Sequence, residues 1–127
     1  MQFGILLAIA VGGALGSVAR HYVSTGVYHV TGSTFPFGIL MVNVVGGLIM
    51  GIVVELGALK LNYGPEMRAF LTTGILGGFT TFSAFSLDAA LLIERGDWFG
   101  AGLYMVSSVV LSVGALFAGL ALVRAFA

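Results

Sequence analysis

Residues 72–86 read TTGILGGFTTFSAFS, which places two adjacent glycines, a run of hydroxyls and three phenylalanines inside a long apolar stretch. No Asp, Glu, Lys or Arg lies between Arg68 and Asp88. About 20 apolar residues are enough for a helix to cross a bilayer. A helix that faced only lipid would not need glycines and hydroxyls at its centre. The stretch therefore predicts a transmembrane helix with a special structure in its middle.

The whole chain has the composition of a membrane protein. Of its 127 residues, 59% are hydrophobic and 8% are charged, whereas a soluble domain has about 25% charged residues. Four apolar stretches cover residues 3–23, 38–59, 68–93 and 98–126. The first has no basic leader and no clear cleavage site, so we expect it to be retained. We predict an all-α integral membrane protein with four transmembrane helices in a single domain, residues 1–127.

Several classes of function are disfavoured. The chain contains no cysteine, which excludes disulfides and thiolate chemistry. Its net charge is zero, which argues against a nucleic-acid partner. His21 and His29 lie near the first connection, and no Ser/His/Asp set or His-x-x-x-His pair is present. An enzyme is therefore the weakest interpretation.

The basic residues are nearly balanced between the two sides of the membrane. With four spans, Lys60, Arg68 and Arg124 lie on one side and Arg20 and Arg95 on the other. The excess of Lys and Arg orients a membrane protein, and a difference of one is too small to do so. We expect dual topology, in which the same chain inserts both ways and pairs as an antiparallel homodimer. The alternative is that one orientation wins by a narrow margin.

Glycines are abundant and spaced for helix packing. Gly12 and Gly16, Gly47 and Gly51, and Gly74 and Gly78 form small-xxx-small pairs, as do two serines of the last stretch. Small residues let membrane helices approach closely. These pairs predict compact packing and no particular chemistry.

The glycine pair of the third stretch favours a broken helix. Gly77 and Gly78 are followed by the β-branched Thr80 and Thr81. Carbonyls that a break frees at membrane depth must face protein, water or an ion. Main-chain carbonyls from Gly77 to Thr80 can thus hold a cation. The alternative is a packing notch in which Ser or Thr hydroxyls bond those carbonyls.

Two neighbouring stripes suggest an anion path. Phe79, Phe82 and Phe85 recur every three residues, so they share a helix face. Phenyl edges carry partial positive charge, and Thr80, Ser83 and Ser86 add hydroxyls beside them. Plain packing is the usual meaning of such stripes.

Other polar residues lie within the apolar stretches. Asn43 is an amide among aliphatic residues, and intramembrane polar residues are functional candidates; helix-to-helix hydrogen bonding is its alternative role. Ser107, Ser108, Ser112 and Tyr104 supply hydroxyls on the last stretch. Arg20 and Asp88 are either vestibule charges or structural partners, and Glu55 is expected to reach the membrane interface.

The chain resembles the Fluc (CrcB) fluoride channels over nearly its whole length. The resemblance rests on three groups of residues: Gly12-Gly13-Ala14-Leu15-Gly16 with Arg20; Pro36-Phe37-Gly38, Val42-Asn43 and Gly46-Gly47; and Thr73-Gly74, Gly77-Gly78, Thr80-Thr81-Phe82-Ser83 and Phe85-Ser86. It implies a passive fluoride channel in a prokaryotic plasma membrane. It also implies an antiparallel homodimer in the bilayer, with two pores and a central structural sodium ion.

The resemblance also implies roles for individual residues. Gly77 and Thr80 match the positions whose backbone carbonyls bind sodium. Arg20 matches a cation near the pore mouth. The positions along the fluoride pore are Asn43, Phe82, Phe85, Ser83, Tyr104, Ser108 and Ser112.

Three positions depart from the family pattern. Ile39 and Ala84 stand where the family usually has hydroxyls, and Asp88 replaces a glutamate. The first two put a role for those positions in doubt. The main rival function is a proton-coupled small-molecule exporter, which needs a titratable carboxylate in its chamber, whereas Glu55 and Asp88 lie toward helix ends. A non-transporting assembly subunit is the second rival, and it leaves the run from Thr80 to Ser86 unexplained.

Overall fold

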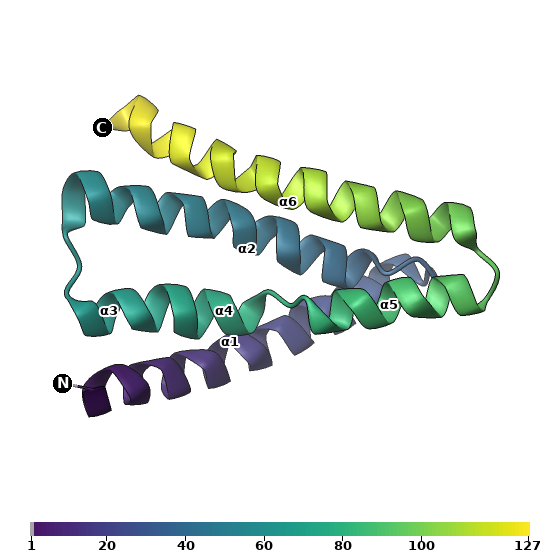
Figure 1. Ribbon diagram of the computed structural model, residues 1–127, viewed down its shortest axis with the longest axis horizontal. Coiled ribbons are helices and arrows are strands. Elements are labelled where there is room, and N and C mark those ends of the chain that lie inside the picture. Colours follow the sequence, from purple (N-terminus) through teal and green to yellow (C-terminus); the bar gives the residue numbers. More distant parts are fainter. Residues whose placement is uncertain (1) are drawn as a thin grey trace.

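The computed structural model describes residues 2–127, which form helices and no strand. The elements follow one another along the colour scale of Figure 1. They are α1 (Gln2–Thr31), α2 (Phe37–Leu56), the π-helical turn η1 (Gly57–Leu61), α3 (Pro65–Ala69), the π-helical segment η2 (Phe70–Leu76), α4 (Gly77–Phe79), α5 (Ser83–Glu94) and α6 (Trp98–Phe126).

Four of the resulting helices are long and apolar enough to cross a membrane. They are Gln2–Thr31, Phe37–Leu61, Pro65–Glu94 and Trp98–Phe126. Large apolar side chains such as Phe3, Val30 and Phe126 are mostly exposed on them, which suits a chain whose solvent is lipid. The prediction of a four-span, multi-pass membrane protein is confirmed.

The predicted spans and the helices differ most in α1. Hydropathy predicts a span that ends at residue 23, whereas the helix continues to Thr31. Gly32 then takes a φ of +59° and ends it, because glycine adopts the left-handed region without strain. Hydropathy marks the part of a helix that suits lipid, and helical hydrogen bonding continues past it.

The third long helix is interrupted. α4 ends at Phe79, Thr80 has extended backbone angles (φ −86°, ψ 158°), and α5 begins at Ser83. Figure 1 shows the ribbon uncoiling between α4 and α5.

The helices pack in pairs through the predicted glycines. A methyl group added at Gly12 or Gly16 would meet the backbone at Phe70 or Ile75 of η2, and one at Gly51 would meet the Leu116 carbonyl of α6. Backbones therefore touch where the small-xxx-small pairs lie. The packing role predicted for the pairs in α1 and α2 is confirmed.

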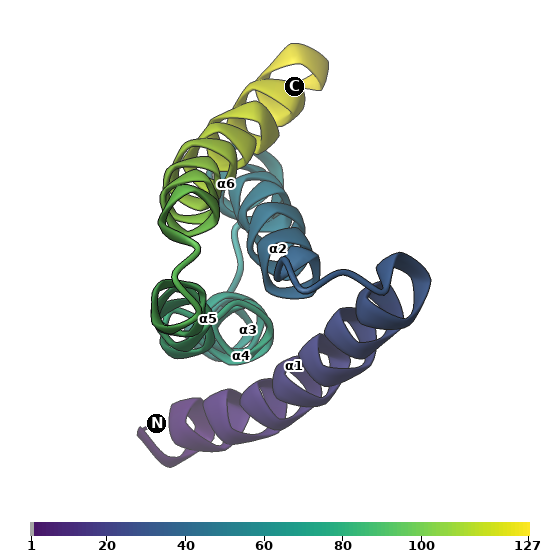
Figure 2. The ribbon, with the colours of Figure 1, turned by 90° about the vertical axis from the view of Figure 1, so that its right-hand side faces the viewer.

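The four long helices do not close into a bundle. α2 contacts both α1 and α6, but α1 contacts neither α5 nor α6 within residues 2–127. Figure 2 shows α1 and α6 on opposite sides of α2 and the interrupted helix. The fold leaves wide helix faces for lipid or for another protein chain.

An ion pair joins the ends of α2 and α6. The carboxylate of Glu55 accepts a hydrogen bond from the guanidinium of Arg124. Glu55 is only 8% exposed, and its expected position at the membrane interface stays a prediction. Packing against α6 covers Glu55, and the flexible Arg124 side chain reaches it.

Candidate functional site

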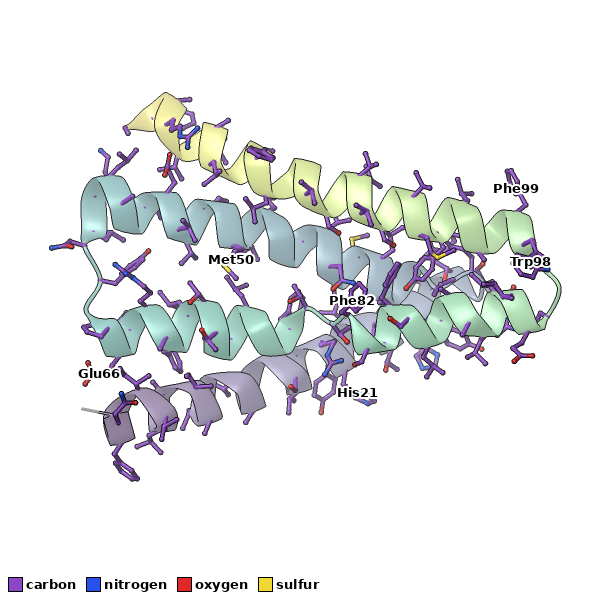
Figure 3. All side chains as sticks on the ribbon, viewed as in Figure 1. His21, Met50, Glu66, Phe82, Trp98 and Phe99 are labelled. Atoms are coloured by element: carbon purple, nitrogen blue, oxygen red, sulfur yellow. The ribbon has the colours of Figure 1, made fainter. Side chains whose placement is uncertain are left out.

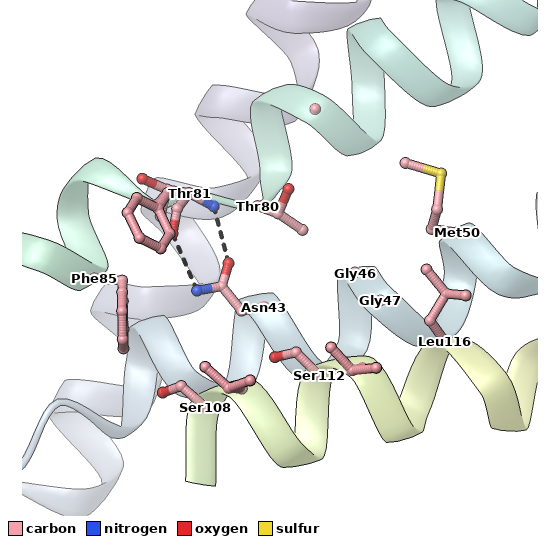
Figure 4. Close-up of a pocket in the computed structure, with 14 residues that line it drawn as sticks. Asn43, Gly46, Gly47, Met50, Thr80, Thr81, Phe85, Ser108, Ser112 and Leu116 are labelled. Atoms are coloured by element: carbon pink, nitrogen blue, oxygen red, sulfur yellow. Dashed lines mark hydrogen bonds between the residues drawn. The ribbon is translucent and has the colours of Figure 1, made fainter. Parts of the chain in front are cut away.

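A groove of about 520 Å³ runs between α2, the interrupted helix and α6. Figure 4 shows it in close-up, with the interrupted segment facing α2 and α6 across it. Its lining residues are Asn43, Gly46, Gly47, Met50, Gly77, Thr80, Thr81, Phe82, Phe85, Ser108, Val109, Ser112, Val113 and Leu116. Seven of the sequence-predicted residues line this groove: Asn43, Gly77, Thr80, Phe82, Phe85, Ser108 and Ser112.

The Asn43 side chain bonds the interrupted segment from α2. Its Nδ2 donates to the carbonyl of Thr81 at 3.1 Å, and its Oδ1 accepts from the Thr81 N–H at 2.9 Å. Both bonds are drawn in Figure 4. An amide nitrogen has two N–H groups, so one of them is left for another partner. Asn43 thus satisfies the backbone N–H and C=O of Thr81, which lies where the helix is interrupted.

Two hydroxyls in the groove are buried and unpaired. The Oγ atoms of Ser108 and Ser112 have no hydrogen-bond partner among residues 2–127. A buried hydroxyl without a partner costs free energy, and serines in membrane helices commonly bond their own backbone, as Ser107 does to the Tyr104 carbonyl. These two hydroxyls are donors available to an occupant of the groove.

Phenyl rings form another part of the wall. The rings of Phe82 and Phe85 lie 5.5 Å apart, centroid to centroid, and are tilted by 46°. Phe82 is 77% exposed and projects from the interrupted segment (Figure 3). Phe85 is partly buried and packs against Tyr104. Tilted rings present edges as well as faces, and the edges attract negative charge.

Tyr104 lies behind this wall. Its side chain is fully buried, and its hydroxyl donates to Asp88 Oδ2 at 3.3 Å. It does not line the groove. A direct role for Tyr104 in a pore wall stays a prediction.

A second, more polar cavity lies on the α1 side of the interrupted segment. Its volume is about 310 Å³, and Arg20 and Ser17 of α1 line it together with Ser83. The backbone from Gly77 to Phe82 borders both cavities, so the interrupted segment is the wall between them. Ser83 and Arg20, predicted to serve an anion path, belong to this cavity and not to the groove.

The interruption changes the hydrogen bonding of the carbonyls near Gly77. In a continuous helix the Thr81 N–H would bond the Gly77 carbonyl, but it donates to Asn43 instead. The Leu76 carbonyl accepts from both the N–H and the hydroxyl of Thr80. Free carbonyls at the end of a helix attract cations, and sodium prefers oxygen ligands of this kind at unwound helices. The Gly77 carbonyl thus lacks its usual helical donor, and it could hold a cation such as sodium together with the Thr80 carbonyl.

The acidic residues lie elsewhere. Glu55 is paired with Arg124 and Asp88 with Tyr104, and no Asp or Glu lines either cavity formed by residues 2–127. The groove offers an occupant amide, hydroxyl and ring-edge groups and no full charge. The amide and hydroxyl groups can donate hydrogen bonds to an occupant of the groove.

Sequence reasoning missed part of the site. Val109 and Val113 line the groove beside the two serines. Each directly follows one of those serines in the sequence, so their presence in the groove was predictable. Met50 and Leu116 extend the groove along α2 and α6. The partner of Asn43 had no signal, because a backbone peptide carries none in a sequence.

Comparison with known proteins supports one family. Residues 7–120 match the family model described as CrcB-like protein, Camphor Resistance (CrcB). A Rhodospirillum centenum protein named fluoride-specific ion channel FluC is 52% identical over 94% of this chain and 95% of its own length. A Nitrobacter hamburgensis protein named fluoride-specific ion channel FluC 1 is 51% identical over 98% of both chains. An Agrobacterium fabrum protein named fluoride-specific ion channel FluC is 53% identical over 91% of this chain and 93% of its own length. The chain therefore belongs to the CrcB-like family.

Proposed function

We propose that this protein is a fluoride-selective passive ion channel of a bacterial membrane, which lets fluoride leave the cell down its electrochemical gradient. The proposal rests on the groove and on relatives whose names state this activity. The protein is a channel and not an enzyme.

The observation that carries the proposal is the pair of buried, unpartnered hydroxyls of Ser108 and Ser112. They line the same groove as the Asn43 amide and the rings of Phe82 and Phe85. A buried donor without a partner gains a hydrogen bond when an anion in the groove accepts from it. Fluoride is the smallest halide and a strong hydrogen-bond acceptor.

The mechanism follows from the cost of removing water from fluoride. A pore must replace the hydration shell with protein groups along its length. Hydroxyls, an amide and ring edges each bind an anion weakly, so the ion can move from one to the next. A lysine or arginine in the groove would hold the ion too tightly. Chloride is larger, so its contacts with the same donors are longer. These donors therefore compensate less for the water that chloride loses on entering the pore.

We further propose that two copies assemble as an antiparallel dimer with two pores. One copy leaves the groove open along a side, and leaves α1 and α6 without mutual contact. The near balance of basic residues, three against two, favours insertion in both orientations. A second copy would cover the open groove and turn it into a pore. Arg20, beside the second cavity, would attract anions to its mouth.

A structural sodium ion is the remaining part of the proposal. The Gly77 and Thr80 carbonyls of both copies would hold it, and its charge would stabilise the freed carbonyls of two helices at once. Replacing sodium by N-methylglucamine should then lower the melting temperature of the detergent-solubilised dimer. An unchanged melting temperature in the absence of sodium would refute this part alone.

The proton-coupled exporter is the rival function. It requires a carboxylate in the transport chamber, whereas Glu55 and Asp88 are bonded to Arg124 and Tyr104 outside both cavities. A pH gradient should therefore not drive solute movement through this protein.

The test is fluoride efflux from liposomes. Purified protein is reconstituted in vesicles loaded with potassium fluoride, valinomycin carries the compensating potassium, and an ion-selective electrode records the released fluoride. We expect rapid fluoride efflux, slow or no chloride efflux from matched vesicles, and strong slowing in Phe82→Leu. Phe117→Leu is the matched control, because Phe117 is also an exposed phenylalanine but lines neither cavity.

Absence of fluoride efflux from a folded, monodisperse protein would refute the channel. Equal efflux of chloride and fluoride would refute selectivity and leave an unselective anion pore.

A further inference from the structure

A row of five aromatic rings leads from the groove to the loop between α1 and α2. Successive ring centroids are 5.5 Å apart from Phe82 to Phe85, 5.1 Å from Phe85 to Tyr104, 5.6 Å from Tyr104 to Phe35, and 4.7 Å from Phe35 to Phe37. All these separations fall in the range in which aromatic pairs attract. The row begins at the groove with Phe82 and ends outside it with Phe37, the first residue of α2.

Tyr104 is the middle ring, and its surroundings leave it little freedom. It is fully buried against Ala89, Leu92 and Ala101, and its hydroxyl is bonded to Asp88. Phe85 and Phe35 both pack on it, and the Phe35 ring meets it nearly at a right angle (87°). Side chains in a close-packed interior move only if their neighbours move. The orientation of Phe85 therefore depends on Phe35 through Tyr104.

The loop between α1 and α2 holds Phe35, the fourth ring of this row, through its backbone. Its N–H donates to the Ser33 hydroxyl at 3.0 Å, and its carbonyl accepts from the Phe37 N–H at 2.8 Å. The preceding Thr34 carbonyl accepts from Arg95, which lies in the turn between α5 and α6. A residue held by its backbone on both sides can fix the ring that it touches.

We propose that Phe35 is a positioning residue for conduction: through Tyr104 it holds the Phe85 ring in the orientation that lines the groove. This inference rests on the proposed channel function. Without the Phe35 ring, Tyr104 gains room, and Phe85 no longer keeps one edge toward the anion. Phe35 itself touches no ion, since it lines neither cavity of residues 2–127.

The first test is a double-mutant cycle on fluoride efflux with Phe35→Leu, Phe85→Leu and the double variant. An aromatic pair contributes enough energy for a change of about three- to tenfold, so Phe35→Leu should slow efflux by that factor. The double variant should be about as slow as Phe85→Leu alone, because Phe35 acts through Phe85. Phe35→Tyr keeps the ring and should restore the rate to within about twofold of the wild type. If Phe35→Leu does not fold, Phe35→Met takes its place, since it keeps most of the volume and removes the ring.

The second test does not depend on transport. A para-fluorophenylalanine placed at position 85 reports its surroundings by ¹⁹F NMR. Its resonance should shift or broaden in Phe35→Leu and stay unchanged in Phe99→Leu, whose phenylalanine is 82% exposed on α6.

The two readouts separate this inference from the proposed function. Wild-type protein without fluoride efflux would refute the channel, and the ¹⁹F signal would still test the packing of Phe85 on its own. An unchanged ¹⁹F signal in Phe35→Leu would overturn the inference. So would a double variant whose slowing equals the product of the two single effects, because the residues would then act independently.

Discussion

Asn43 bonds both backbone polar groups of a single residue, Thr81, and that geometry separates two roles of Asn43. As a structural partner it satisfies the N–H and C=O of Thr81; as a groove residue it offers its second N–H to an anion. Substitutions that keep one role and remove the other can distinguish them.

Asn43→Ala should therefore impair both stability and transport. The backbone N–H and C=O of Thr81 each lose a hydrogen bond, which costs about 1–3 kcal/mol. The melting temperature of the purified protein should therefore fall. Fluoride efflux should fall at least about tenfold, the change that 1.4 kcal/mol of lost positioning corresponds to. Met41→Ala, an exposed position of the same helix, is the control for the loss of side-chain volume and should change neither quantity much.

Asn43→Asp keeps an oxygen acceptor for the Thr81 N–H and adds a negative charge. Its second oxygen would face the Thr81 carbonyl, to which Nδ2 donates in the wild type, so we expect a variant no more stable than Asn43→Ala that conducts as poorly or worse. If Asn43→Ala transported fluoride at the wild-type rate, Asn43 would have no part in the pore.

The serines of α6 provide a second prediction at this scale. Ser108→Ala and Ser112→Ala remove hydroxyls that have no partner within residues 2–127, so neither change breaks a hydrogen bond of the folded chain. Melting temperatures should hardly change, and removing a donor worth about 1 kcal/mol to the ion should slow efflux about fivefold. Ser107→Ala is the matched control, because that hydroxyl bonds its own helix and should leave efflux unchanged. Normal efflux in both variants would remove these hydroxyls from the path.

At the scale of elements, the pair formed by Glu55 and Arg124 joins α2 to the end of α6. The two side chains differ in exposure: that of Glu55 is 11% exposed and that of Arg124 is 60% exposed. An uncompensated charge is costly where it is buried, so removing one partner should not equal removing the other.

Arg124→Gln should accordingly destabilise the protein more than Glu55→Gln. The first change leaves a buried carboxylate without its cation and should cost about 1–3 kcal/mol, whereas the second leaves an exposed guanidinium. Thermal unfolding of both single variants and of the double variant measures this, and the double variant should be more stable than Arg124→Gln alone. Equal effects of the two single changes would mean that the pair is as open to solvent at Glu55 as at Arg124.

Elements were the most predictable part of this chain. Hydropathy and charge placed all four long helices. The end of α1 could not be predicted from hydropathy, since the helix stops where Gly32 changes its backbone direction. The groove was partly predictable, because Asn43 and the serines are polar residues in apolar stretches. The position of Ser83 in the other cavity depends on the path of the chain after Phe79, which residue types alone do not determine.

At the scale of the molecule, the basic residues and the open helix arrangement lead to a prediction of topology. Single cysteines at Thr34 and Leu61 would lie on opposite sides of the membrane, and the chain has no other cysteine. With dual topology, an impermeant maleimide added to intact spheroplasts should label about half of the molecules at either position. Labelling of one position alone would show a single orientation and refute the antiparallel dimer.

The length of α1 and α6 has a consequence for the surrounding lipid. With 30 and 29 residues, α1 and α6 are each about 45 Å long, while a typical hydrocarbon core is about 30 Å thick. Each must tilt or extend into the headgroups, and since α1 and α6 do not touch, they can tilt by different amounts as the bilayer thins or thickens. The interrupted helix contacts both α1 and α6, so it feels the tilt of each. The acyl-chain length of the lipid thus sets the tilt of α1 and α6. Vesicles made from short-chain or long-chain lipids would change the strain on the groove without any change of sequence.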